Sequence, residues 1–181
     1  LFGLTAKREY DAYVAEHHRR TRPFEDERWS VYDQSQGDAL LFYASLPNAD
    51  AATKDAILSR KRALADSIDI FKFRADFDLY RAYMRSDSYH WGSNNARAAY
   101  GNTNYDLLQH GLAAPADVAS YEERVLGLLH SFHGMNPMQL VYLTNMYAHG
   151  GDACADEAYH TWFRDGHPRW DNARTSELGP A

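Results

Sequence analysis

The 181-residue sequence predicts an all-α fold. Apolar residues recur at helical spacing along much of the chain, and short polar turns separate these stretches. No stretch alternates apolar and polar residues for long enough to predict a sheet. Apolar residues make up 45% of the chain and charged residues 24%, which favours a packed core over general disorder. The length fits one domain or one piece of a larger domain.

The first half of the chain predicts three helices, over Thr5–Arg20, Gly37–Leu46 and Ala51–Ile68. Thr5 is the expected N-cap of the first helix, because its hydroxyl can accept a hydrogen bond from a free amide of the first turn. The third helix has an apolar stripe with basic residues opposite it. The stripe consists of Ile57, Leu64 and Ile68.

The second half predicts a short helix over Asp76–Arg85, from the spacing of Phe77, Tyr80 and Met84. A loop over 86–94 follows, and then a helix over Asn95–His110 with Gly111 just past its end. The clearest helix begins at Pro115 and ends before Gly134. Its expected buried stripe is Val118, Tyr121, Val125, Leu128, Leu129 and Phe132.

The pattern loosens after the clearest helix. Pro137–Tyr147 is apolar and fits either an extended or a helical conformation. Residues 148–181 are rich in Gly, Asp, His and Trp and show no periodicity. A compact domain rarely contains so long a stretch without periodic structure unless the stretch has a function. We therefore expect this stretch to have a functional role.

Charge and cysteine content exclude several classes of protein. The net charge is −6, which argues against sequence-independent nucleic-acid binding and against an electrostatic membrane anchor. No apolar run approaches the roughly 18 residues of a membrane-spanning helix. The single Cys154 excludes an intrachain disulfide and multi-cysteine zinc sites. We therefore expect neither a nucleic-acid nor a membrane partner.

Several possible metal and catalytic motifs are incomplete. Glu157-x-x-His160 matches half of a di-metal carboxylate motif, and the chain has no second copy. His130 and His133 fit the end of a helix better than a metal pair. The sequence has no Gly-x-Ser-x-Gly and no glycine-rich phosphate loop. A solvated loop face is favoured over calcium ligation for Asp152, Asp156 and Glu157.

Aromatic residues make up 14% of the chain and gather with polar residues in two loops. The first is Tyr89–Asn94, and the second is Tyr159–Phe163 followed by His167 and Trp170–Asn172. Flat rings beside Asn, Asp, Ser and His suit a pyranose, which has an apolar CH face and a rim of hydroxyls. A nucleic-acid ligand would also need basic residues along its phosphates. Carbohydrate binding is therefore one interpretation, and aromatic packing between helices is the other.

Particular motifs resemble glycoside hydrolase family 9, the inverting cellulases. His133–Asn145 resembles that family's Gly-x-Asn-Pro-x-x-x-x-Tyr-[Val/Leu]-Thr signature, and Trp91–Asn94 resembles its Trp-Gly-Ser-Asn loop. Ala155–Phe163, with Trp170–Asn172 and Gly179-Pro180, resembles a bacterial branch of the family. The similarity runs from about Asp26 to the end of the chain.

The resemblance implies an (α/α)₆ barrel of the six-hairpin glycosidase type. Residues 1–181 would supply its later helices and C-terminal substrate loops, as an excerpt of a longer polypeptide with additional domains. The implied activity is hydrolysis of β-1,4-glucosidic bonds in cellulose or related β-glucans with inversion, by a secreted bacterial endoglucanase. One carboxylate activates water and a carboxylic acid protonates the leaving oxygen. No cofactor is required for this chemistry, while family members often bind a structural calcium ion.

The family's base lies in an Asp-Ala-Gly-Asp motif upstream and its acid is a Glu downstream, so no catalytic residue is assigned here. His160 is the nearest candidate. The resemblance implies that Trp91 stacks on a glucosyl ring and that His160 lies near the cleavage-site sugar. Many relatives have an Arg two residues after that His, where this chain has Trp162. The expected substrate-binding residues are Trp91, His160, Tyr89, Ser93, Trp162, Asp171, Asn172, Tyr32 and Asp33. The alternative function is a non-catalytic helical module that binds glycan or protein through the same aromatics.

Overall fold

The computed structural model describes residues 1–25, 29, 34–67, 78–90, 92–143, 146–151, 153 and 154. These residues form helices joined by turns, with isolated bridges between His133 and Val141 and between Val141 and Cys154. No strand occurs within the described ranges, so the prediction of an all-α fold is confirmed for that part of the chain. None of the helices described is long and apolar enough to cross a membrane.

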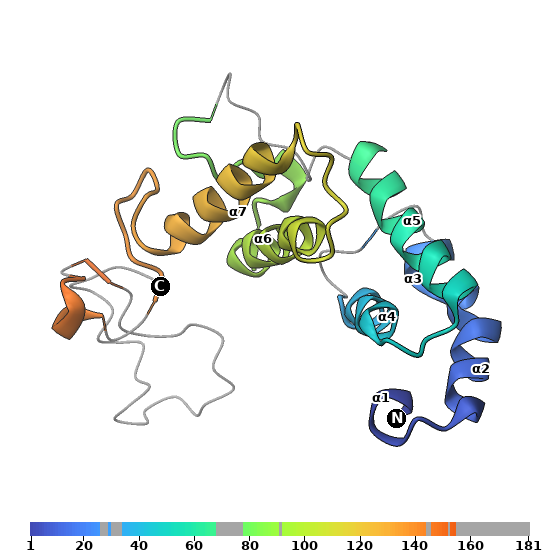
Figure 1. The fold of residues 1–181 in the computed structure, drawn as a ribbon. Coiled ribbons are helices and arrows are strands. Elements are labelled where there is room, and N and C mark those ends of the chain that lie inside the picture. Colours follow the sequence, from blue (N-terminus) through green and yellow to red (C-terminus); the bar gives the residue numbers. More distant parts are fainter. Residues whose placement is uncertain are drawn as a thin grey trace.

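The N-terminal helices pack together as one group (Figure 1). They are α1 (Phe2–Thr5), α2 (Arg8–His17), η1 (His18–Arg20), α3 (Arg22–Glu25), α4 (Ser35–Ser45) and α5 (Ala51–Ser67). Helix α4 packs against α5 and α3. Ile57 and Leu64 are buried as their stripe predicted, and Ile68 lies outside the described residues.

The prediction of the first helix is wrong at its N-terminal end. Thr5 is the last residue of α1 rather than an N-cap, and the chain reverses at Ala6, which has a left-handed φ of 54°. Helix α2 begins at Arg8 after the extended residue Lys7. The Thr5 hydroxyl donates to the carbonyl of Leu1 at 3.0 Å, so it closes the preceding turn instead of opening the next helix.

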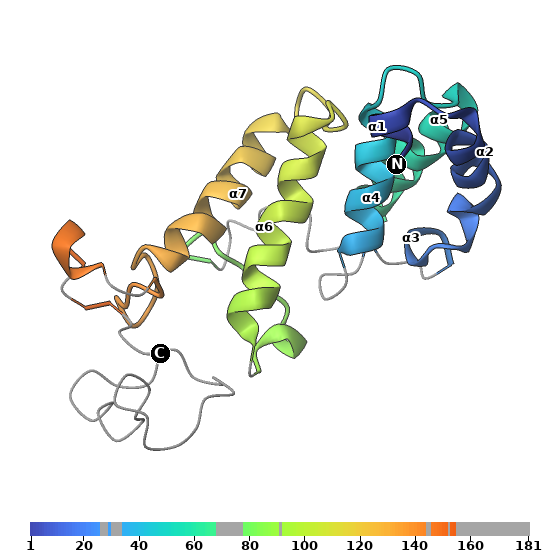
Figure 2. The same ribbon diagram turned by 90° about the horizontal axis from the view of Figure 1, so that it is seen from below.

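Helices α6 (Ser93–Gln109) and α7 (Val118–Phe132) form an antiparallel pair (Figure 2). Gly111 follows α6 with a φ of 61°, as predicted. Its amide donates to Leu108 at 3.1 Å and the next amide, of Leu112, donates to Leu107 at 2.8 Å. This is a Schellman motif, in which glycine tolerates the left-handed conformation that the turn requires.

Helix α7 departs from its prediction in two respects. It begins at Val118, three residues after Pro115. Tyr121 and Leu128 of the predicted stripe are buried, but Leu129 is 48% exposed. Arg124 is fully buried on this helix. The predicted stop is confirmed, because Gly134 has a φ of 101° just past the last turn.

The helix predicted over Asp76–Arg85 does not form in its described part, residues 78–85. These residues form a turn and a stretch without regular structure that leads into η3 (Ser86–Ser88). Arg81 is left-handed, with a φ of 58°. Its carbonyl lies so close to Gly127 of α7 that a Cβ there would collide with it. Packing against α7 therefore overrides the local helical pattern, while Met84 is still buried.

Candidate functional site

An apolar groove runs between α6 and α7 and has a volume of about 480 Å³. Its exposed large apolar side chains are Tyr105, which is 51% exposed, Leu129 and Leu143. The polar side chains of the lining are Arg97, Asn102 and His133. The lining residues are Arg97, Ala98, Gly101, Asn102, Tyr105, Val125, Leu128, Leu129, Phe132, His133 and Leu143.

The groove is lined by residues of the Gly-x-Asn-Pro segment and by residues of α6 that follow the Trp-Gly-Ser-Asn loop. Because α6 and α7 are antiparallel, the beginning of α6 and the end of α7 lie at the same end of the pair (Figure 2). Arg97, in the first turns of α6, lines the groove and donates from Nη1 to Oδ1 of Asn94 at 3.0 Å. His133 and Leu143 line it from the other segment. Segments more than 30 residues apart in sequence thus share one surface.

Arg97 is a candidate ligand-binding residue that sequence analysis missed. Its Nε is buried and donates no hydrogen bond to any described residue. Because the Nε is enclosed, a ligand oxygen in the groove would be bound by the terminal guanidinium nitrogens of this lining residue. The sequence signal that could have identified Arg97 is its position four residues after Ser93, which places both residues on one face of a helix.

Asn136, the asparagine of the Gly-x-Asn-Pro signature, organises the loop that follows α7. It is 3% exposed. Its Nδ2 donates to the carbonyls of Ser131 and Leu140, both at 2.8 Å. Its Oδ1 accepts from the amides of Met138 at 3.1 Å and Leu140 at 3.4 Å. This side chain therefore holds the loop that returns the chain to the groove, and it does not face a ligand.

Two of the predicted substrate residues lie within the described ranges. Tyr89 follows η3 and is 57% exposed. Ser93 is the first residue of α6 and is half-buried, after Gly92 with a φ of 79°. Neither lines the groove, and Ser93 lies four residues before Arg97, which does. The other predicted residues lie outside the described residues: Trp91, His160, Trp162, Asp171, Asn172, Tyr32 and Asp33.

The histidines near the end of α7 fit the helix-end interpretation. The ring centroids of His130 and His133 are 6.0 Å apart and the rings are tilted to one another. The described residues contain no group of three His, Cys, Asp or Glu side chains placed to hold a metal ion. The acidic residues considered for calcium, Asp152, Asp156 and Glu157, lie outside those residues.

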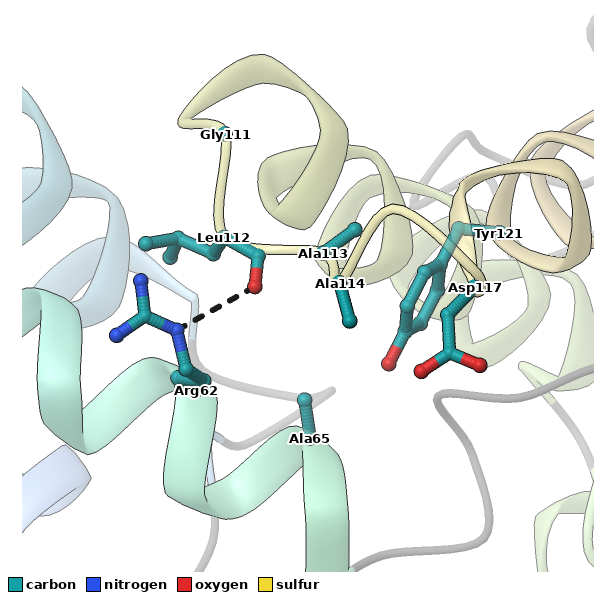
Figure 3. A pocket seen from close by; sticks show the side chains of 8 residues that line it. All are labelled: Arg62, Ala65, Gly111, Leu112, Ala113, Ala114, Asp117 and Tyr121. Atoms are coloured by element: carbon teal, nitrogen blue, oxygen red, sulfur yellow. Dashed lines mark hydrogen bonds between the residues drawn. The ribbon is translucent and has the colours of Figure 1, made fainter.

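A second, smaller pocket of about 280 Å³ lies between α5 and the α6–α7 turn (Figure 3). The Tyr121 hydroxyl and the Asp117 carboxylate lie on one side of it and Arg62 on the other (Figure 3). The Arg62 Nε donates to the carbonyl of Leu112 at 3.4 Å. This pocket is at the far end of the helix pair from Tyr89, so it contains none of the predicted substrate residues.

Comparisons of the chain with protein-family models, with curated proteins and with solved structures find no match. Function is therefore inferred from the groove and from the two motif segments of the sequence.

Proposed function

We propose that this chain is the later part of an (α/α)₆-barrel catalytic domain that hydrolyses β-1,4-glucosidic bonds in β-glucans with inversion, in an endoglucanase secreted by a bacterium. One observation carries the proposal. Arg97, three residues after the Trp-Gly-Ser-Asn loop, and His133, which begins the Gly-x-Asn-Pro segment, line the same groove, although they are far apart in sequence. Each motif alone has little specificity, and lining residues within or just after both motifs support a shared role.

The side chains of the groove suit a sugar ring. Tyr105 and Leu129 present apolar surface to the CH face of a pyranose. Arg97 and His133 offer hydrogen-bond partners for its hydroxyls. In the proposed site Trp91 and His160 complete these contacts at the cleavage-site sugars.

The proposed role of this chain is to position the substrate. Inverting hydrolysis needs a carboxylate base and a carboxylic acid on opposite faces of the bond. The family resemblance places both groups outside this sequence. Holding the sugar in a reactive geometry lowers the barrier because less orientational entropy is lost in the transition state. The chemistry needs no cofactor.

The test uses the full-length enzyme with cellooligosaccharides as substrates. Trp91→Ala should lower kcat/KM by about tenfold or more, because stacking that tightens in the transition state is lost. Arg97→Met should raise KM, since a hydrogen bond from a charged donor is removed. Arg62→Met is the matched control, because Arg62 lies at the other pocket. An unchanged kcat/KM for Trp91→Ala would remove that residue from the site.

The largely apolar lining of the groove favours one second candidate, a non-catalytic module that binds glycan or protein. The same assay separates the two functions. Release of new reducing ends with the α-anomer formed first supports the inverting hydrolase. Binding of cellooligosaccharides without any release supports the module.

A further inference from the structure

Arg124 is a fully buried charged residue on α7. Its exposed fraction is 0%, and none of its three guanidinium nitrogens donates a hydrogen bond to a described residue. A buried cation without hydrogen bonds loses the hydration that it has in water. An apolar side chain of similar length would not carry that cost. Stability alone is therefore a poor reason for an arginine at this position.

Two tyrosine rings flank the Arg124 guanidinium. Its Cζ lies 5.7 Å from the ring centroid of Tyr83 and 5.7 Å from that of Tyr100. Burial lowers the pKa of Arg124 to about 10, against the influence of the Asp78 carboxylate, which raises it. The side chain is therefore still a cation at neutral pH, and its ring contacts are cation–π interactions.

These contacts connect α7 to the 78–90 segment. Tyr83 belongs to that segment, and Tyr100 belongs to α6. The Tyr100 hydroxyl lies 2.9 Å from Oγ of the buried Ser88, which directly precedes Tyr89. Gly127 lies three residues after Arg124 on α7. The carbonyl of Arg81, in the same 78–90 segment, packs directly against it. The segment is thus held against α7 at Arg81 and Tyr83, and against α6 at Ser88, just before Tyr89.

We propose that Arg124 is a positioning residue that holds the 78–90 segment against α7 and thereby fixes Tyr89 at the start of the predicted substrate loop. The expected effect of Arg124 on glycan binding and cleavage rests on the proposed function. The structural part does not, because it concerns contacts within the chain.

Hydrogen exchange tests the structural part. The amides of Ser88 and Tyr89 donate to the carbonyls of Arg85 at 2.9 Å and Ser86 at 3.3 Å. Arg124→Met removes the cation and keeps a long apolar side chain. We expect these two amides to exchange about tenfold faster or more, through local opening, while the Tm stays equal or rises. Tyr83→Leu removes one flanking ring from the segment, and we expect the same local change.

Lys61→Met is the matched control, because Lys61 is also fully buried but is paired with Asp106 at 2.7 Å. Lys61→Met should lower the Tm by about 6 °C or more. It should leave the exchange rates of the Ser88 and Tyr89 amides unchanged relative to those of the α7 amides. The proposal is overturned if Arg124→Met lowers the Tm as Lys61→Met does without selectively speeding exchange at Ser88 and Tyr89. Unchanged exchange in both Arg124→Met and Tyr83→Leu would also overturn it.

A second measurement separates this inference from the proposed function. In the full-length enzyme, Arg124→Met should lower kcat/KM on cellotetraose by about tenfold, because a displaced loop misplaces the sugar. If the unaltered enzyme neither binds nor cleaves cellotetraose, the proposed function fails while the exchange result still decides the structural part. Faster exchange with unchanged kcat/KM in an active enzyme would contradict the role of Arg124 at the substrate.

Discussion

Asp11 on α2 shows how one buried carboxylate joins three helices. Its Oδ1 accepts from the Tyr43 hydroxyl of α4 at 2.7 Å and from the Asp50 amide, just before α5, at 3.1 Å. Its Oδ2 accepts from Arg8 at 3.0 Å. The hydrogen bond from Tyr43 is the main reason that the pKa of Asp11 is lowered. Burial raises the pKa of Tyr43 to about 12, so its hydroxyl remains a donor at neutral pH.

The lowered pKa of Asp11 predicts a loss of stability in acid. Because the ionised form is favoured in the folded state, its contribution is complete above the unfolded pKa of about 3.9 and is lost as pH falls through the lower folded pKa. Asp11→Asn should be less stable than the unaltered chain at pH 7, and the difference should shrink below about pH 4. Urea unfolding followed by circular dichroism between pH 2 and 7 measures this.

Asp55→Asn is the control for that experiment, because Asp55 is exposed on α5. It should show no comparable dependence of its stability difference on pH. A stability difference for Asp11→Asn that stays constant from pH 7 to pH 2 would contradict the role given to the carboxylate.

The loop after α7 is an element whose shape depends mainly on one side chain. Asn136 makes hydrogen bonds with both of its polar atoms, so Asn136→Asp keeps the acceptor and loses the two donated bonds. We expect this substitution to lower the free energy of unfolding by about 1–3 kcal/mol, since two carbonyls lose their partner in a buried site. Asn95→Asp, on the exposed side of α6, should change it by less than about 0.5 kcal/mol. Equal effects of the two substitutions in urea unfolding would contradict this role of Asn136.

The elements that the sequence predicted well are those whose pattern is local. Helices α5, α6 and α7 have periodic apolar residues, and Gly111 and Gly134 mark two of their ends through backbone conformations that glycine favours. The 78–85 stretch also has helical spacing but forms no helix, and its Arg81 carbonyl packs against Gly127, a contact with a distant part of the chain. Such a contact leaves no signal in the local pattern.

For the candidate site too, local sequence patterns were predictable and contacts between distant parts of the chain were not. The two motif segments were recognisable from sequence, and the groove follows from the antiparallel arrangement of α6 and α7. The positions of Arg97 and Arg124 were not predictable, because an arginine on an otherwise amphipathic helix is usually assigned to its solvated face. Only packing shows that Arg124 is enclosed and that the Nε of Arg97 is buried at the groove.

At the scale of the whole molecule, polar contacts join the N-terminal helices to the α6–α7 pair, which stand as two groups in Figures 1 and 2. Lys61 of α5 donates to Thr103 at 3.0 Å and to Asp106 at 2.7 Å, both on α6, and its Nζ lies 4.5 Å from the Trp29 ring centroid. Gln34 donates to the carbonyl of Ala99 at 3.0 Å. The Lys61–Asp106 pair is the ion pair between these groups within the described residues.

The position of this pair makes its removal a test of how the two groups stabilise each other. Lys61→Met leaves Asp106, whose side chain is 18% exposed, without its cation, and should lower the free energy of unfolding by about 3 kcal/mol. The double variant Lys61→Met/Asp106→Leu removes both charges and should recover most of that loss, because an apolar pair of similar volume needs no compensation for lost hydration. Urea unfolding of the two single variants and the double variant gives the coupling energy directly. Additive losses in the double variant would show that the charges act independently and that α5 and α6 are held together by their apolar contacts alone.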